Sequence, residues 1–248
     1  MTRGLTAAVL LSAVCVTGCE STQARSARIA RAGHGSAAAQ TLREGPANSS
    51  VHVTQTTLVS ASGAVAAVVR LHNGGRSQAN VPILVDARDA SGRVVYRNDI
   101  QGLDPALQGI SLLRAGADAY WVNDQVSATP PPRSLRVRVG RAQAAVTARP
   151  PRIVVDQVQE QRESGANVVT GRVATTSTAV QRNVAIYCVA VRGRRIVAAG
   201  RALVPRVHGK PVGFNVYLVG NPKGARLVFT APPTVLAKGA SMATATEG

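Results

Sequence analysis

Short segments of alternating apolar and polar residues, each closed by a turn signal, constrain this chain more than any other feature. Between residues 51 and 140 the separators are Ser62-Gly63, Asn73-Gly74-Gly75, Ala90-Ser91-Gly92 and Pro130-Pro131-Pro132. Gly, Asn, Ser and Pro suit the backbone angles of turns, and alternation places one side of a strand in a core. Short strands at this spacing are typical of a β-sandwich.

The same order of features returns about 100 residues later, between residues 153 and 236. The matched pairs are Ser62-Gly63 with Ser164-Gly165, Asn80-Val81 with Asn183-Val184, and Trp121 with Phe214. An internal repeat of this kind predicts two tandem copies of one small domain. We therefore expect β-sandwich domains at residues 51–140 and 153–236, joined by a linker at 141–152 and followed by a disordered tail at 237–248.

The amino-acid composition also favours β-strands over helices. Aromatic residues make up only 3% of the chain, so Val and Ala must fill any core, and β-branched Val favours strands. We predict an all-β protein of two tandem small β-sandwiches.

One stretch carries a family resemblance. "VDARDASG" followed by "RVV" keeps Asp89 and Gly92 and resembles the immunoglobulin-like sandwich repeats of secreted bacterial proteins, including the FxLYD type. The second copy, "VAVRGRRIV", keeps a Gly and loses the Asp. The resemblance spans roughly residues 51–236. It implies a sandwich fold and an extracytoplasmic role, and it carries over no functional residue.

The beginning of the chain has the pattern of a signal peptide. A basic head is followed by an apolar run from Leu5 to Val16, which is too short to span a bilayer and suits the apolar core of a secretory signal. Cys15 and Cys19 have three residues between them, whereas a redox pair has two, and no further metal ligands follow nearby.

Val16-Thr17-Gly18-Cys19 resembles the lipobox of bacterial lipoproteins. The resemblance implies a signal peptide at residues 1–18, a diacylglyceryl group on Cys19, and attachment to membrane lipid outside the cytoplasm. Two acyl chains on one residue would hold the protein firmly, which a single chain does not. The alternative is an ordinary secretory signal with a chance cysteine.

Residues 19–50 are expected to form a disordered tether, because the stretch is rich in Ser, Ala and Gly and has almost no large apolar residues. Arg25, Arg28 and Arg31 recur three apart close to the expected anchor. They indicate either a basic arm for an anionic leaflet or a soluble spacer.

The formal net charge is +17, and it is unevenly distributed. Residues 51–140 contain nine Arg and six Asp, whereas residues 164–246 contain eight Arg, three Lys and no acidic residue. Arg192, Arg194 and Arg195 should form a hairpin tip, where guanidinium groups can bind phosphate or carboxylate groups. The alternative is a solvated basic turn that serves solubility. Nucleic acid is not expected as a partner outside the membrane.

No catalytic constellation is apparent. The four histidines, at 34, 52, 72 and 208, are scattered along the sequence, and no nucleophile elbow or phosphate-binding loop occurs. Asp86, Asp89 and Asp99 surround a predicted hairpin, where turn chemistry is the ordinary explanation and calcium the alternative. Cys188 lies in an apolar run and is interpreted as a small buried hydrophobe. We expect no catalytic residue, metal site or cofactor.

Tyr120 and Trp121 are the densest aromatic spot of the chain. Neighbouring residues of a strand face opposite sides, so Trp121 should face the core, like Phe214, and Tyr120 should lie on a partner surface.

The sequence thus predicts a lipid-anchored protein of the cell or outer membrane, facing the periplasm or exterior, that binds or scaffolds without catalysis. Its basic second domain would contact anionic envelope polymers or headgroups. The alternative is an accessory subunit that recognises an envelope protein through strand edges.

Overall fold

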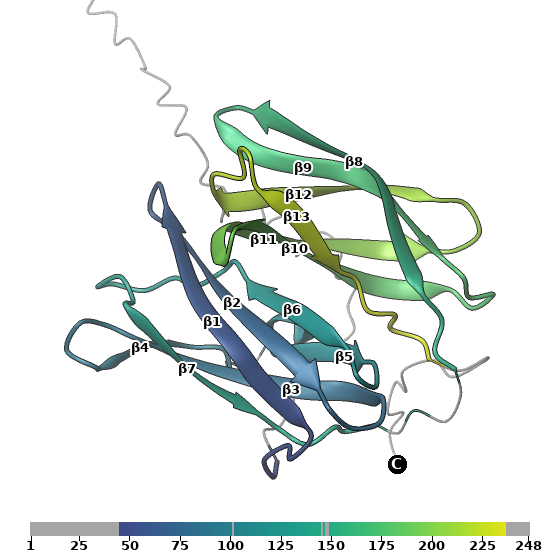
Figure 1. Ribbon diagram of the computed structural model, residues 1–248, viewed down its shortest axis with the longest axis horizontal. Helices are drawn as coiled ribbons and strands as arrows, with labels where there is room; N and C mark the ends of the chain where they lie inside the picture. The colour runs from purple at the N-terminus through teal and green to yellow at the C-terminus, as the bar shows by residue number, and fades with distance from the viewer. Residues whose placement is uncertain (1–44, 101, 145, 147–148, 237–248) are drawn as a thin grey trace, which may run out of the picture.

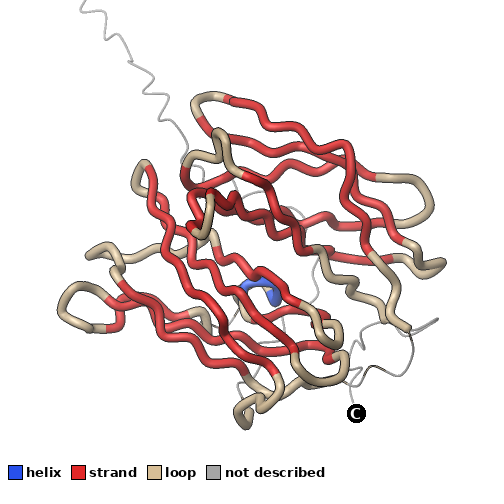
Figure 2. The backbone as a smooth tube through the Cα atoms, viewed as in Figure 1, coloured by secondary structure: helices blue, strands red, loops and turns tan. Residues whose placement is uncertain are grey.

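Thirteen strands and one short 3-10 helix make up the part of the chain that a computed structural model describes, residues 45–236 without 101, 145 and 147–148. Strands dominate the backbone (Figure 2). The predicted all-β fold is confirmed, with several sheets stacked as in a β-sandwich. Within the described residues, no helix has the length and apolar character needed to cross a membrane.

The first half of the described chain forms two sheets. One has the order β1-β2-β6, and in the other β3 pairs with β4, β5 and β7. The strands of this half are β1 (Val51–Ala61), β2 (Ala64–Asn73), β3 (Gln78–Arg88), β4 (Val94–Arg97), β5 (Gly109–Leu113), β6 (Asp118–Asn123) and β7 (Ser134–Val139). The 3-10 helix η1 (Pro105–Leu107) precedes β5.

The second half forms one six-stranded sheet with the order β13-β10-β11-β12-β9-β8. Its strands are β8 (Ile153–Glu163), β9 (Ala166–Thr175), β10 (Gln181–Arg192), β11 (Arg195–Val207), β12 (Val212–Gly220) and β13 (Arg226–Thr230). Only two residue pairs, Ala198 with Gly220 and Ala199 with Val219, join β11 to β12. Apart from this short junction, β8-β9-β12 repeats the pairing of β1-β2-β6, and β13-β10-β11 repeats that of β7-β3-β4.

Local backbone details recur as well. Ser62 and Ser164 both take positive φ, at 49° in each case, at the first turn of each half. Asn80 and Asn183 do the same, at 50° and 49°. Asn tolerates this left-handed region better than most residues, which explains why it recurs at equivalent positions. The sequence match therefore corresponds to a match in backbone conformation.

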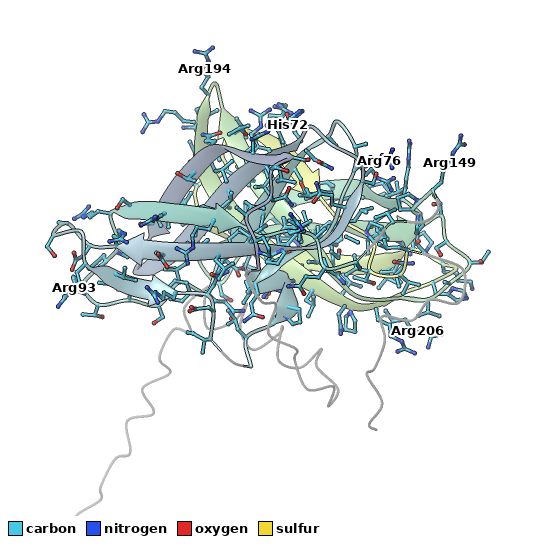
Figure 3. All side chains as sticks on the ribbon, turned by 90° about the horizontal axis from the view of Figure 1, so that it is seen from below. His72, Arg76, Arg93, Arg149, Arg194 and Arg206 are labelled. Atoms are coloured by element: carbon cyan, nitrogen blue, oxygen red, sulfur yellow. The ribbon has the colours of Figure 1, made fainter. Side chains whose placement is uncertain are left out.

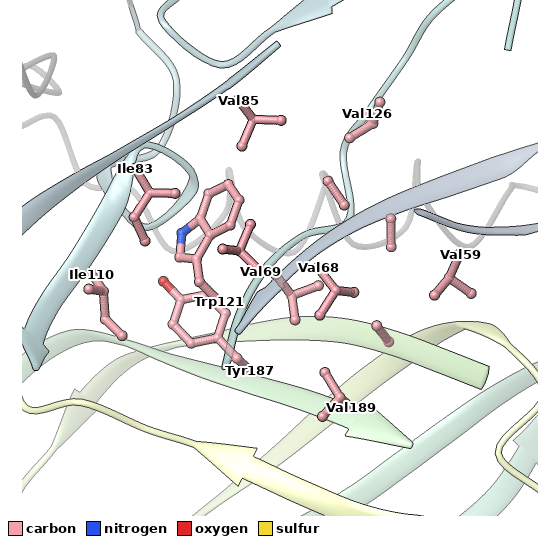
Figure 4. Packing of buried hydrophobic residues seen from close by; sticks show 14 of the residues in the cluster. Val59, Val68, Val69, Ile83, Val85, Ile110, Trp121, Val126, Tyr187 and Val189 are labelled. Carbon is pink, nitrogen blue, oxygen red and sulfur yellow. The ribbon is translucent and has the colours of Figure 1, made fainter. Parts of the chain in front are cut away.

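The two halves share a core. The larger apolar cluster is centred on the first half, yet it includes these buried residues of the second half: Ala185, Tyr187, Val189, Ile196, Ala199, Leu203 and Val219. Figure 4 shows Tyr187 and Val189 beside Trp121, Val68 and Val69. Full burial of a Val, Leu or Ile side chain stabilises a fold by about 1.5–3 kcal/mol, so the contact between the halves is a large contribution.

Strand β10 packs into two apolar clusters, one on each face of its sheet. Val184, Ile186 and Cys188 face the smaller cluster inside the second half, while Tyr187 and Val189 face the larger one. Both faces of the strand are buried, which is why "NVAIYCVAV" is a continuous apolar run. In Figure 1 the second half, green to yellow, lies directly against the first.

Backbone hydrogen bonds of the first half reach beyond two of the expected boundaries. Hydrogen bonding begins before residue 51, because the amide of Asn48 donates to the carbonyl of Val139 at 2.9 Å and its side-chain oxygen accepts from the amide of Val51. Residues 143 and 144 of the expected linker pair with the start of β3, at Asn80 and Ala79. Both segments extend the first half, since backbone groups next to a sheet gain hydrogen bonds by continuing it.

Candidate functional site

The predicted basic turn forms the tip of the β10–β11 hairpin. Arg192 and Arg195 are directly opposite each other, and Gly193, with φ of 59°, and Arg194 form the two-residue loop between them. Gly takes this left-handed conformation without steric cost, as tight hairpins require. The side chain of Arg194 projects away from the body of the molecule (Figure 3).

Two further cations join the turn from a part of the sequence about 30 residues later. Arg226 is opposite Val191 in the β10–β13 pair, and a guanidinium nitrogen of Arg192 donates to the carbonyl oxygen of Lys223. We name the five exposed residues of this end the basic tip: Arg192, Arg194, Arg195, Lys223 and Arg226.

The basic tip carries positive charge only. Within the described part of the chain none of its five side chains forms an ion pair, and the sequence has no acidic residue between 164 and 246. Like charges directly opposite on paired strands, as at Arg192 and Arg195, are destabilising on their own. A bound phosphate or carboxylate would offset that repulsion, because guanidinium groups bind such anions bidentately.

Tyr120 is half-buried and lies at the junction of the two halves. Its backbone amide donates to the hydroxyl oxygen of Thr230 at 2.9 Å, and the Arg70 guanidinium lies 5.8 Å from its ring centre. Trp121 faces the core and is fully buried. The residue that the sequence assigned to a partner surface therefore contacts β13 of the same chain through its backbone.

A groove with a volume of about 340 Å³ opens near this junction. Its walls come from both halves, at residues 112–114 and 117–119 on one side and at 152–154 and 230–233 on the other. The Arg114 guanidinium donates to the carbonyl oxygens of Pro150 and Pro151, at 3.2 and 2.5 Å. Burial, and secondly the charge of Arg152, lower the pKa of Arg114.

Cys188 lacks the surroundings of a nucleophile. It is fully buried, and burial raises the pKa of its thiol to about 12, so the reactive thiolate is disfavoured. This agrees with its interpretation as a small buried hydrophobe. Cys19, the expected lipidation site, lies outside the described residues.

The aspartates Asp86 and Asp89 of the β3–β4 hairpin form ion pairs and hydrogen bonds that stabilise the fold. Asp86 pairs with Arg138 at 2.8 Å and with Arg97 at 3.3 Å. Asp89 accepts from Ser91, and that hydrogen bond in particular lowers the pKa of its carboxyl group. No group of three His, Cys, Asp or Glu side chains suited to a metal occurs within the described ranges.

Two arrangements were invisible in the sequence. Arg201 of β11 is buried against Asp104 and Asp124 of the first half, with 2.6 Å between Nη1 and the Asp104 carboxylate. Burial alone would lower the pKa of Arg201, but the two carboxylates outweigh it and raise the pKa. The other arrangement places His52 opposite His72 on paired strands. Both depend on strand register between distant segments, and no local motif signals them.

Comparison with protein-family models, with curated proteins and with solved structures finds no match.

Proposed function

We propose that this protein is a lipid-anchored extracytoplasmic protein of the bacterial cell envelope that binds anionic envelope components without catalysis. The signal-like beginning of the chain and Cys19 would provide the anchor, and the basic tip would provide the contact. The observation that carries the binding role is the gathering of five exposed cations from two separate segments at one end of the second half.

The physical basis is electrostatic. A cationic side chain close to an anionic membrane surface gains about 1 kcal/mol, and such contacts weaken as salt screens them. Arginine adds bidentate hydrogen bonds to phosphate and carboxylate oxygens. Anionic headgroups and anionic envelope polymers present these groups, so the basic tip would bind either through the same chemistry.

Sedimentation with vesicles tests this function. The mature chain with Cys19→Ser, which cannot be acylated, should sediment with vesicles rich in phosphatidylglycerol and stay in solution with neutral ones, and high salt should release it. A triple variant, Arg192→Ser with Arg194→Ser and Arg195→Ser, should lose at least tenfold in affinity.

The matched control changes the same charge elsewhere, at the exposed Arg133, Arg136 and Arg141 of the first half. If both triple variants lost the same affinity for anionic vesicles, binding would depend on net charge alone, and the basic tip would have no specific role. Mass spectrometry of the amino-terminal peptide of the membrane-extracted protein tests the anchor separately, because an unacylated Cys19 would contradict it.

A second candidate function is recognition of an envelope protein through a strand edge. Strand β8 is at the end of its sheet, pairs only with β9 among the described strands, and exposes 44% of Val154. An unpaired edge can accept a strand from another chain, although the bulge at Gln157, with φ of 48°, limits regular pairing. Photo-crosslinking from Val154 and from Tyr120 in intact membranes tests this: a partner joined only through Val154 assigns the edge.

A further inference from the structure

Three polar side chains form a row across the sheet β1-β2-β6. His52 of β1 is directly opposite His72 of β2, and His72 is directly opposite Asp118 of β6. Residues directly opposite on antiparallel strands place their side chains on the same face. The inward face of this sheet is the one that buries Leu71 and Trp121, so the row occupies the outer face. Figure 3 places His72 at the surface.

Asp118 fixes the orientation of the His72 ring. The Nδ1 atom of His72 lies 2.9 Å from one carboxylate oxygen of Asp118, and the Arg70 guanidinium lies 2.6 Å from the other. An ionised carboxylate only accepts hydrogen bonds, so Nδ1 donates and the lone pair of the neutral ring is on Nε2. Asp118 also forms an ion pair with Arg70.

Histidines that bind a metal through one ring nitrogen usually donate a hydrogen bond from the other nitrogen to a carboxylate or a similar acceptor. The carboxylate fixes the orientation of the ring and makes the metal-binding nitrogen a better ligand. His52, directly opposite His72 on the neighbouring strand, provides a second imidazole. Opposite Cβ atoms on antiparallel strands are about 4.5–5.5 Å apart, and two imidazole nitrogens can then converge on an ion at about 2.0–2.1 Å.

We propose that His52 and His72 bind a divalent transition metal ion on the outer face of this sheet, with Asp118 as a positioning residue. Imidazole ligands suit Zn²⁺, Cu²⁺ and Ni²⁺, and water would complete the coordination. Two protein ligands make an open, exchangeable site, which fits capture or transfer of an ion better than a structural role. The site lies on the first half and is independent of the basic tip.

The test uses the full mature chain without a polyhistidine tag and measures Cu²⁺ and Zn²⁺ binding by equilibrium dialysis. We expect one ion per chain. His52→Gln and His72→Gln should each weaken binding at least tenfold, and His208→Gln, the control at an exposed histidine of the second half, should bind as the parent does. The electron paramagnetic resonance spectrum of the Cu²⁺ form should show coupling to two imidazole nitrogens, reduced to one in each site variant.

Asp118 is tested through His72. Asp118→Ala should weaken binding about 10–100-fold, the usual effect of removing such a partner, while Asp118→Glu should restore part of it. Equal binding by the parent and both site variants, an equal loss in His208→Gln, or a spectrum without imidazole coupling would overturn the proposal. All these side chains are exposed or half-exposed, so their substitution should leave the fold intact. An unchanged urea unfolding midpoint for each variant checks this.

Discussion

The guanidinium of Arg201 and the carboxylate of Asp104 are 2.6 Å apart, although 97 residues separate them in the sequence and both side chains are buried. Asp104 also accepts from the amide of Ala106 and so caps helix η1. The ion pair therefore connects β11, a central strand of the second half, to helix η1 of the first. A buried pair of this kind contributes less to net stability than to fixing which surfaces meet.

Loss of the buried cation should be costly. Arg201→Met leaves Asp104 and Asp124 as buried carboxylates without their cation, and breaking such a group typically destabilises a protein by about 3–5 kcal/mol. Urea unfolding followed by circular dichroism measures the loss. Arg194→Met, at the exposed hairpin loop, should change stability by less than about 0.5 kcal/mol. Comparable stability of the two variants would mean that water reaches the Arg201 site.

Asn98 should be among the most sensitive polar positions. Its side-chain oxygen accepts from the amide of Val85, and its nitrogen donates to the carbonyls of Ile83 and Leu107, each within 2.8 Å and all buried. Asn98→Ala leaves these backbone groups without partners, at about 1–3 kcal/mol for each unsatisfied group. Thermal unfolding should show a large fall in Tm. Asn221→Ala, at an exposed turn, is the control and should leave Tm nearly unchanged.

Gly200 should tolerate no side chain. A Cβ atom there would lie 2.2 Å from the carbonyl oxygen of Tyr217, because β11 and β12 approach closely at this point. Gly200→Ala should destabilise the protein by about 1–3 kcal/mol, as overpacking usually does. Gly213→Ala has no atom nearer than 4.0 Å and should be neutral or slightly stabilising. Equal denaturation midpoints for the two variants would contradict the close approach.

Stability should fall in alkaline solution. Burial raises the pKa of Cys188 from 9.0 to about 12 and also raises that of Tyr187. A group with a raised pKa in the folded state contributes its full stability below the unfolded pKa and loses it as pH rises toward the folded pKa. The loss should therefore begin near pH 9 and continue to about 12.

Urea unfolding of parent and Cys188→Ala at a pH below 9 and at one between 9 and 12 separates this contribution. The variant should show a weaker dependence on pH, and the remaining slope should begin higher, near the ordinary tyrosine pKa of 10.0. A slope identical to that of the parent would show that Cys188 ionises alike in the folded and unfolded states.

Much of the local structure could be read from the sequence. Alternation and turn residues located the hairpin loops at Ser62-Gly63, Ser164-Gly165 and Gly193-Arg194, and they placed Trp121 in the core. These features follow from neighbouring residues, since turn angles and the two faces of a strand are decided within a few positions.

The sequence by itself determined the strands, their turns, their inward faces and the repeat between the halves. Only the tertiary structure decided that the second face of β10 would close the core of the first half, that Arg201 would be buried between Asp104 and Asp124, and that His52, His72 and Asp118 would align. The physical reason is that the two kinds of information have different ranges along the chain. Local periodicity shows which side of a strand is apolar, whereas the surface that covers this side depends on register and packing between segments far apart in the sequence.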